Sequence, residues 1–175
     1  MSRWLRFAPL VILVAVIAGL IWRLATPVDS SVHSRMQGRP VPTFYPSVGA
    51  VHKPAFGSGE LALGQPHIVN FFASWCVPCI SEVKVLMDLK ARGALIDGVA
   101  VRDRPEDVED FLARHGDPYG PITGDPTSEL QIKFGSSGVP ESFIVDGRGV
   151  IRYQHIGPIE ASEVPAILAK LEQAR

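Results

Sequence analysis

The apolar and polar positions divide the chain into one continuous apolar segment near the N-terminus and a longer part with short, periodic apolar runs. The apolar segment is a run of 16 residues without a charge, Phe7 to Trp22, with arginines on both sides. As a helix it would be about 24 Å long, slightly shorter than a bilayer's hydrocarbon core of about 30 Å. The flanking arginines, together with Trp4 and Trp22, suit the two membrane interfaces. The pattern therefore predicts a single transmembrane anchor over residues 7–23.

A cleaved signal peptide is the alternative interpretation of the same segment. Cleavage after Ala25 would place Arg23 where such sites carry a small residue, so an uncleaved anchor fits better. Residues 24–37 then form a linker, because they contain a proline, several serines and threonines, and no sustained periodicity. Positive charge is similar before and after the apolar run, so charge alone does not orient the anchor.

The remainder, residues 38–175, reads as one globular domain in which strand-like runs alternate with helical periodicity. Its first ten residues are broken by prolines and leave room only for a short edge strand. Strands are expected at 67–72, 94–101, 121–123, 141–145 and 150–156, and helices at 80–92, 105–115, 127–134 and 162–173. The turn Asp146–Gly149 joins the last two strands as a hairpin. This order predicts an α/β domain with a mixed sheet and helices on both faces.

Composition agrees with a globular domain, with 46% hydrophobic and 20% charged residues. The formal net charge is −1, and no basic stripe indicates a nucleic-acid partner. Cysteine occurs only at positions 76 and 79, which excludes a small disulfide-stapled scaffold. A disulfide that closes so short a loop constrains the unfolded chain little. The pair therefore indicates redox chemistry or metal binding.

The cysteines fall between a predicted buried strand and a predicted helix. Cys76 then lies near the helix N-terminus, where backbone N–H groups stabilise a thiolate and lower the thiol pKa. Cys79 lies one turn further along, more buried, where it can resolve a mixed disulfide formed at Cys76. Pro78 suits the first turn of the helix.

Two other uses of the pair are less well supported. A metal site needs further ligands, and the five histidines are scattered without a second Cys-x-x-Cys or a His-x-x-x-His. Covalent haem attachment requires a histidine directly after the second cysteine, and Ile80 stands there. No metal or other cofactor is expected.

Two segments resemble known sequences. Phe72-Ala-Ser-Trp-Cys-Val-Pro-Cys79 resembles the thioredoxin active-site motif, and Gly138-Val-Pro140 resembles the thioredoxin loop whose proline is cis and faces the cysteines. The longer stretch from Phe134 to Gly157, FGSSGVPESFIVDGRGVIRYQHIG, is similar to the CcmG/DsbE branch, the membrane-tethered thioredoxins of cytochrome c maturation. GRPVPTF, from Gly38 to Phe44, is similar to the entry of that branch's domain.

The resemblance implies a thiol–disulfide oxidoreductase that acts as a reductase. Its role would be to keep the haem-attachment cysteines of apocytochrome c reduced, directly or through a partner thiol protein. A membrane thiol reductase would supply the electrons. The domain would then lie on the periplasmic side of the cytoplasmic membrane, with residues 1–6 in the cytoplasm.

The resemblance also implies roles for single residues. Cys76 is the attacking thiol, Cys79 the resolving thiol and Pro140 the cis proline. Glu141 follows as the branch's acidic residue, and its carboxylate is expected near the cysteines, where it would raise the pKa of Cys76.

Trp75, Val139 and Pro140 are expected to contact the substrate.

Two positions depart from thioredoxin: Asn70 replaces a buried aspartate that helps proton transfer, and Val77 replaces a glycine. Two other functions stay open, namely a general membrane-anchored thiol reductase and a copper-delivery protein.

Overall fold

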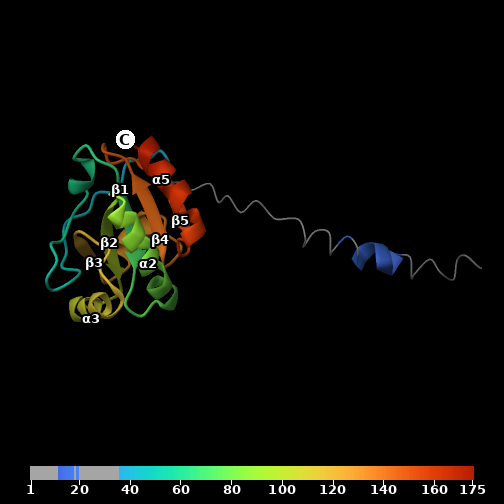
Figure 1. Cartoon of the computed structure of the whole chain (residues 1–175), viewed down its shortest axis with the longest axis horizontal. Coiled ribbons are helices and arrows are strands. Elements are labelled where there is room, and N and C mark those ends of the chain that lie inside the picture. The colour runs from blue at the N-terminus through green and yellow to red at the C-terminus, as the bar shows by residue number, and fades with distance from the viewer. Residues whose placement is uncertain (1–11, 18, 20–35) are drawn as a thin grey trace, which may run out of the picture. The chain divides into compact units, whose positions relative to one another are not determined.

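The computed structural model describes residues 12–17, 19 and 36–175 (Figure 1). The chain divides into two units, Met1–His33 and Ser34–Arg175. In the first, residues 12–17 and 19 are helical. No helix within the described residues is both long and apolar enough to cross a membrane. Most of the predicted anchor at 7–23 and of the linker at 24–37 falls outside the described residues, so both stay predictions.

The second unit is built on a five-stranded mixed sheet of order β3-β2-β1-β4-β5. The strands are β1 (His67–Phe72), β2 (Leu95–Val101), β3 (Ile122–Asp125), β4 (Glu141–Val145) and β5 (Ile151–Ile156). β1 lies at the centre, parallel to β2 and antiparallel to β4, while β3 continues the parallel half and β5 the antiparallel half. The mixed sheet predicted from the sequence is therefore confirmed.

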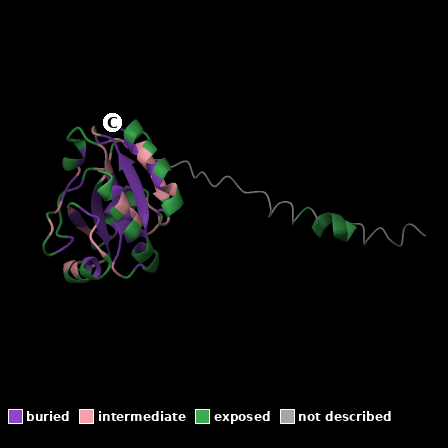
Figure 2. Cartoon of the chain, viewed as in Figure 1, coloured by how far each residue is buried: buried purple, intermediate pink, exposed green. Residues whose placement is uncertain are grey.

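Helices lie on both faces of the sheet. They are α2 (Val77–Ala91), α3 (Pro105–His115), α4 (Glu129–Lys133) and α5 (Val164–Gln173), with 3₁₀ turns η2 (Glu60–Ala62) and η3 (Ala161–Glu163). The apolar sides of α2, α3 and α5 share one core cluster with one face of the sheet. The other face packs against α4, η2 and the segment around Phe44 and Phe56. Figure 2 shows most of the strand residues as buried and the outer sides of the helices as exposed.

The central strand is buried on both faces, which explains why it reads as an almost continuous apolar run. Its Ile68 and Phe72 belong to the cluster with α2, α3 and α5, and its Val69 and Phe71 to the opposite cluster. Asn70 is the polar exception on the α2 side and is fully buried. The parallel strands β1, β2 and β3 all end at one edge of the sheet, and β1 leads there into the cysteine pair.

The largest differences from the sequence expectation lie at the start of α2 and in the stretch after residue 38. Helix α2 begins at Val77 rather than at residue 80, because Cys76 acts as its N-cap and Pro78 fits its first turn. In the proline-broken stretch after residue 38, no strand forms within the described residues; only isolated bridges pair Pro40 with Val150 and Val48 with Thr123. These prolines cannot donate to a ladder, so a regular strand does not form there.

Candidate functional site

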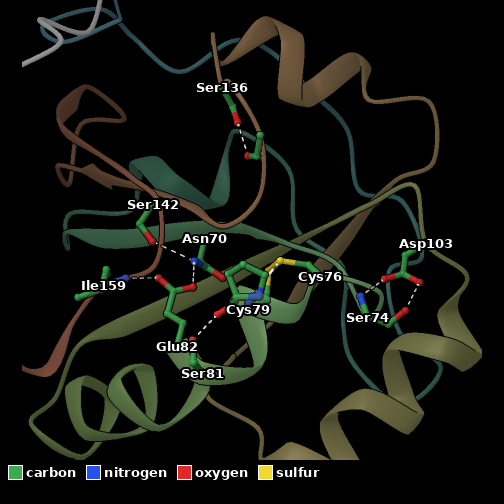
Figure 3. The surroundings of a disulfide bond; sticks show 12 residues. Asn70, Ser74, Cys76, Cys79, Ser81, Glu82, Asp103, Ser136, Ser142 and Ile159 are labelled. Carbon is green, nitrogen blue, oxygen red and sulfur yellow. Dashed lines mark hydrogen bonds between the residues drawn. A yellow bond between two sulfur atoms is a disulfide. The ribbon is translucent and has the colours of Figure 1, made fainter. Parts of the chain in front are cut away.

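The cysteine pair forms a disulfide at the start of α2, with an S–S distance of 2.09 Å and a Cα–Cα distance of 5.3 Å (Figure 3). Cys76 is the N-cap residue, with extended backbone angles, and its Sγ accepts a hydrogen bond from the Cys79 backbone N–H at 3.2 Å. An N-terminal amide of the helix thus points at the sulfur of Cys76. When the bond is reduced, this amide and the helix dipole favour the thiolate form of Cys76.

Burial does not separate the two cysteines in this oxidised form. Cys76 is 4% exposed and Cys79 is 2% exposed. The assignment of Cys76 as the attacking thiol therefore depends on its place at the helix N-terminus, not on a larger exposed surface.

Exposed apolar side chains surround Cys76. Trp75 is 58% exposed and Val77 is 75% exposed, so a partner docking at Cys76 meets both. The indole N–H of Trp75 donates to the carbonyl of Arg102 at 3.3 Å. This bond ties the active-site loop to the segment that follows β2.

Asp103 holds the same loop from the β2 side. Its carboxylate accepts hydrogen bonds from the backbone N–H of Ser74 at 2.5 Å and from the Ser74 hydroxyl at 2.7 Å (Figure 3). Two bonds to one carboxylate fix the residues just before Cys76 in place. The sequence alone did not single out Asp103.

The loop before β4 has the peptide geometry expected from the resemblance. The Val139–Pro140 bond is cis, as predicted. Val139 is half-buried and packs against the core cluster that contains both cysteines, and Pro140 is buried. The carbonyl of Pro140 accepts a hydrogen bond from the backbone N–H of Gly157 at 3.1 Å, which fixes the loop to the end of β5.

Glu141 points away from the cysteine side of the sheet. Its neighbour Ser142 lies on the face that carries α2, so strand alternation places Glu141 on the opposite face, with Phe143. One carboxylate oxygen accepts bonds from the Ser136 hydroxyl at 2.8 Å and from the Ser137 backbone N–H at 2.7 Å, while the other accepts from the Gln154 amide. The expectation that this carboxylate lies beside the cysteines is therefore corrected. It binds the loop that leads to the cis proline.

We expect Glu141→Ala to lower the free energy of unfolding by about 2 kcal/mol, because several partly buried donors lose a charged acceptor. Glu141→Gln is the matched control and should cost only about 1 kcal/mol, since an amide oxygen can still accept from the loop. Urea unfolding of the oxidised protein measures both. Equal, small losses in the two variants would show that the carboxylate does not hold the loop.

A buried carboxyl group lies one turn beyond Cys79 on the same side of α2. This residue is Glu82, only 1% exposed. Its Oε2 accepts a hydrogen bond from the Asn70 amide at 3.1 Å, and its Oε1 accepts from the backbone N–H of Ile159 at 3.0 Å (Figure 3). Among the described residues, Glu82 supplies an acid on the side of the sheet where Asn70 replaces the usual aspartate.

Burial raises the pKa of Glu82 from 4.5 to about 7, although the hydrogen bonds from Ile159 and Asn70 act in the opposite direction. A group that titrates near neutral pH can both accept and return a proton under ordinary conditions. The sequence carries one signal for this residue. Glu82 falls in the helical stripe of Cys79, Leu86 and Leu89, where an ionisable side chain must be buried.

Comparison with known proteins identifies relatives that carry out thiol–disulfide exchange. The family model described as Redoxin matches residues 36–171. The chain is 37% identical to the thiol:disulfide interchange protein DsbE homolog of Paracoccus denitrificans over 180 residues, covering 97% of each chain. It is 32% identical to the thiol:disulfide interchange protein DsbE of Escherichia coli K12 over 165 residues, covering 91% of this chain and 88% of the relative.

A solved structure shows the same fold. The thiol:disulfide interchange protein, thioredoxin family protein, from Chlorobium tepidum TLS is 29% identical. It covers 77% of this chain and 94% of its own, with a TM-score of 0.61. With the Cys76–Cys79 disulfide at the start of α2, these matches establish a thioredoxin-like thiol–disulfide oxidoreductase. The chain therefore belongs to the Redoxin family and is a relative of the DsbE thiol:disulfide interchange proteins.

Proposed function

We propose that this oxidoreductase works as a reductase in cytochrome c maturation, keeping the haem-attachment cysteines of apocytochrome c reduced, directly or through a partner thiol protein. The observation that carries the chemistry is the pairing of Cys76 at the N-cap of α2 with a buried carboxyl group one turn beyond Cys79. The choice of substrate is supported by the resemblance of the segment from Phe134 to Gly157 to the CcmG/DsbE branch.

The first step uses the sulfur at the helix N-terminus. The Cys76 thiolate attacks one sulfur of the substrate's disulfide, the substrate S–S bond breaks, and a mixed disulfide with Cys76 forms. The released substrate sulfur takes up a proton. The N–H group of Cys79, which donates to the Cys76 sulfur in the oxidised protein, stabilises the attacking thiolate.

The second step uses Cys79 and Glu82. The Glu82 carboxylate accepts the thiol proton of Cys79, directly or through one water, and the Cys79 thiolate attacks the Cys76 sulfur. The mixed disulfide breaks, and the second substrate sulfur leaves as a thiolate that takes up a proton. The substrate has gained two electrons, and the protein ends as the Cys76–Cys79 disulfide. A pKa of about 7 suits Glu82 to this transfer.

Substrate contacts come from both sides of the pair. Trp75 and Val77 present apolar surface before and after Cys76, and Val139 and Pro140 form the loop that packs against the cysteine cluster. An extended peptide that carries the target cysteines would lie along the cis-proline loop. Glu141 contributes by fixing that loop, not by changing the charge next to Cys76.

The reductase needs an electron supply and a location. A membrane thiol reductase would return the Cys76–Cys79 disulfide to the dithiol. The apolar run at residues 7–23 would hold the domain on the periplasmic side of the cytoplasmic membrane, with residues 1–6 in the cytoplasm. A reporter fused after Arg175 reads the side of the membrane directly.

No observation favours the copper-delivery alternative over the reductase. Within the part of the chain that the structure describes, no group of three or more His, Cys, Asp or Glu side chains is placed to hold a metal ion. A general thiol reductase for other substrates shares all the chemistry above, so only substrate preference separates it from the proposed function.

The reduced full-length chain should reduce an oxidised peptide containing Cys-x-x-Cys-His at least about tenfold faster than a control peptide of the same composition with the two cysteines further apart. Rates are read from thiol release under single-turnover conditions. Equal rates on both peptides would support the general reductase. No reduction of either peptide would overturn the proposal.

A further inference from the structure

Both N–H groups and the oxygen of the Asn70 side-chain amide are hydrogen-bonded in the core. Its amide nitrogen donates to Glu82 and, at 2.9 Å, to the Ser142 hydroxyl. Its amide oxygen accepts from the Tyr119 hydroxyl at 2.8 Å. The four residues come from α2, β1, β4 and the segment after α3, and all are buried.

Tyr119 and Glu82 together set which way this amide points. Burial raises the pKa of Tyr119 well above its ordinary value, with the charges of Glu82 and Asp117 adding to the effect, so its hydroxyl stays a donor. A carboxylate only accepts hydrogen bonds, so an N–H group of Asn70 faces Glu82, and the amide oxygen accepts from the Tyr119 hydroxyl on the other side. The ring of Tyr119 is stacked on Phe72 at 4.5 Å, which holds the hydroxyl in position.

The arrangement favours one protonation state of Glu82. As a carboxylate, Glu82 accepts one hydrogen bond on each oxygen, from Asn70 and from the Ile159 N–H. A proton on either oxygen would make that oxygen a weaker acceptor for its donor. The two donors therefore stabilise the charged form against the cost of burial.

Few other charges act on this carboxyl group. The influences on its pKa are burial, which raises it, and the hydrogen bonds from Ile159 and Asn70, which lower it; its charge in turn raises the pKa of Tyr119. Ser142 from β4 and the Ile159 backbone from the connection after β5 are neutral. The hydrogen bond from Asn70 is thus one of the few adjustable influences on proton exchange at Glu82.

We propose that Asn70 and Tyr119 are positioning residues of the exchange site: Tyr119 orients the Asn70 amide, and Asn70 holds the Glu82 carboxylate ready to take the proton of Cys79. The residue that replaces the aspartate of ordinary thioredoxins is then a hydrogen-bond donor that serves an acid on α2. This inference rests on the role proposed above for Glu82.

The test is the pH profile of peptide reduction by the reduced full-length chain between pH 5 and 9. Asn70→Leu removes the donor and should move the midpoint upward by about one pH unit, a tenfold change in proton affinity. Tyr119→Phe keeps the stacked ring and removes only the hydrogen bond to the amide oxygen of Asn70. A smaller upward shift of the midpoint is expected. Ser142→Ala is the matched control, because it removes a partner of Asn70 without releasing the amide, and its midpoint should stay in place.

The outcomes separate this inference from the role of Glu82. Glu82→Gln should remove the pH-dependent step from the profile. If it does, but Asn70→Leu and Tyr119→Phe leave the midpoint unchanged or lower it, the positioning role is wrong and the role of Glu82 stands. If Glu82→Gln leaves the profile intact, both are overturned. Should Asn70→Leu fail to fold, as urea unfolding would show, the comparison of Tyr119→Phe with Ser142→Ala decides.

Discussion

Cys79→Ser is expected to stop turnover and to turn the protein into a trap for its substrates. Cys76 still attacks a disulfide, but no second thiol is present to break the mixed disulfide, so adducts accumulate through Cys76. Diagonal gels of membranes from cells that make the variant should show adducts that disappear on reduction. Turnover in the peptide assay should fall to the uncatalysed rate.

Cys76→Ser provides the control, since it also stops turnover but should trap nothing. Cys79 lacks the N-cap place that activates Cys76. If Cys76→Ser trapped the adducts and Cys79→Ser trapped none, the roles of the two thiols would be reversed.

The oxidised protein should lose about 3 kcal/mol of unfolding free energy between pH 4 and pH 8 because of Glu82 alone. Its pKa is raised from 4.5 to about 7 by burial. Between these values the folded state keeps a proton that the unfolded state has released, so stability falls as pH rises and levels off above about pH 7. The glutamine of Glu82→Gln does not titrate, so the variant's loss of unfolding free energy over the same pH range should be smaller by about 3 kcal/mol.

Urea unfolding of the disulfide form at the two pH values measures this difference, since neither cysteine titrates there. The other titrating groups are common to both proteins and cancel in the comparison. Parallel pH dependence in the two proteins would mean that Glu82 has an ordinary pKa and is not poised for proton transfer at neutral pH.

The elements and the cysteine pair were predictable because their signals are local. The apolar run of β1 leads directly into the Cys-x-x-Cys motif, and the cis proline lies in a motif of three residues. The start of α2 was placed three residues late, because capping by a cysteine has no strong sequence signature.

Glu82 was missed because glutamate is rarely buried in folded proteins, and its buried hydrogen-bond partners are distant in the sequence. The buried stripe of α2 runs through Cys79, Glu82 and Leu86. A glutamate inside that stripe is the signal of a buried acid, and it lies within the helix expected at 80–92.

The orientation of Glu141 was not accessible from the pattern, because β4 is buried on both faces. In such a strand, alternation does not distinguish the two sides. Asp103 is 29 residues from Ser74, and only the parallel pairing of β1 with β2 brings them together. These two positions depend on the tertiary structure.

The redox state of Cys76 and Cys79 in intact cells tests the central proposal most directly. Cells that make the protein are quenched with acid, free thiols are alkylated with a mass tag, and the two forms are separated on a gel. A reductase supplied by a membrane thiol donor should be largely in the dithiol form, and loss of that donor should shift it to the disulfide. A pair that is largely oxidised while the donor is active would contradict the account and indicate an oxidase.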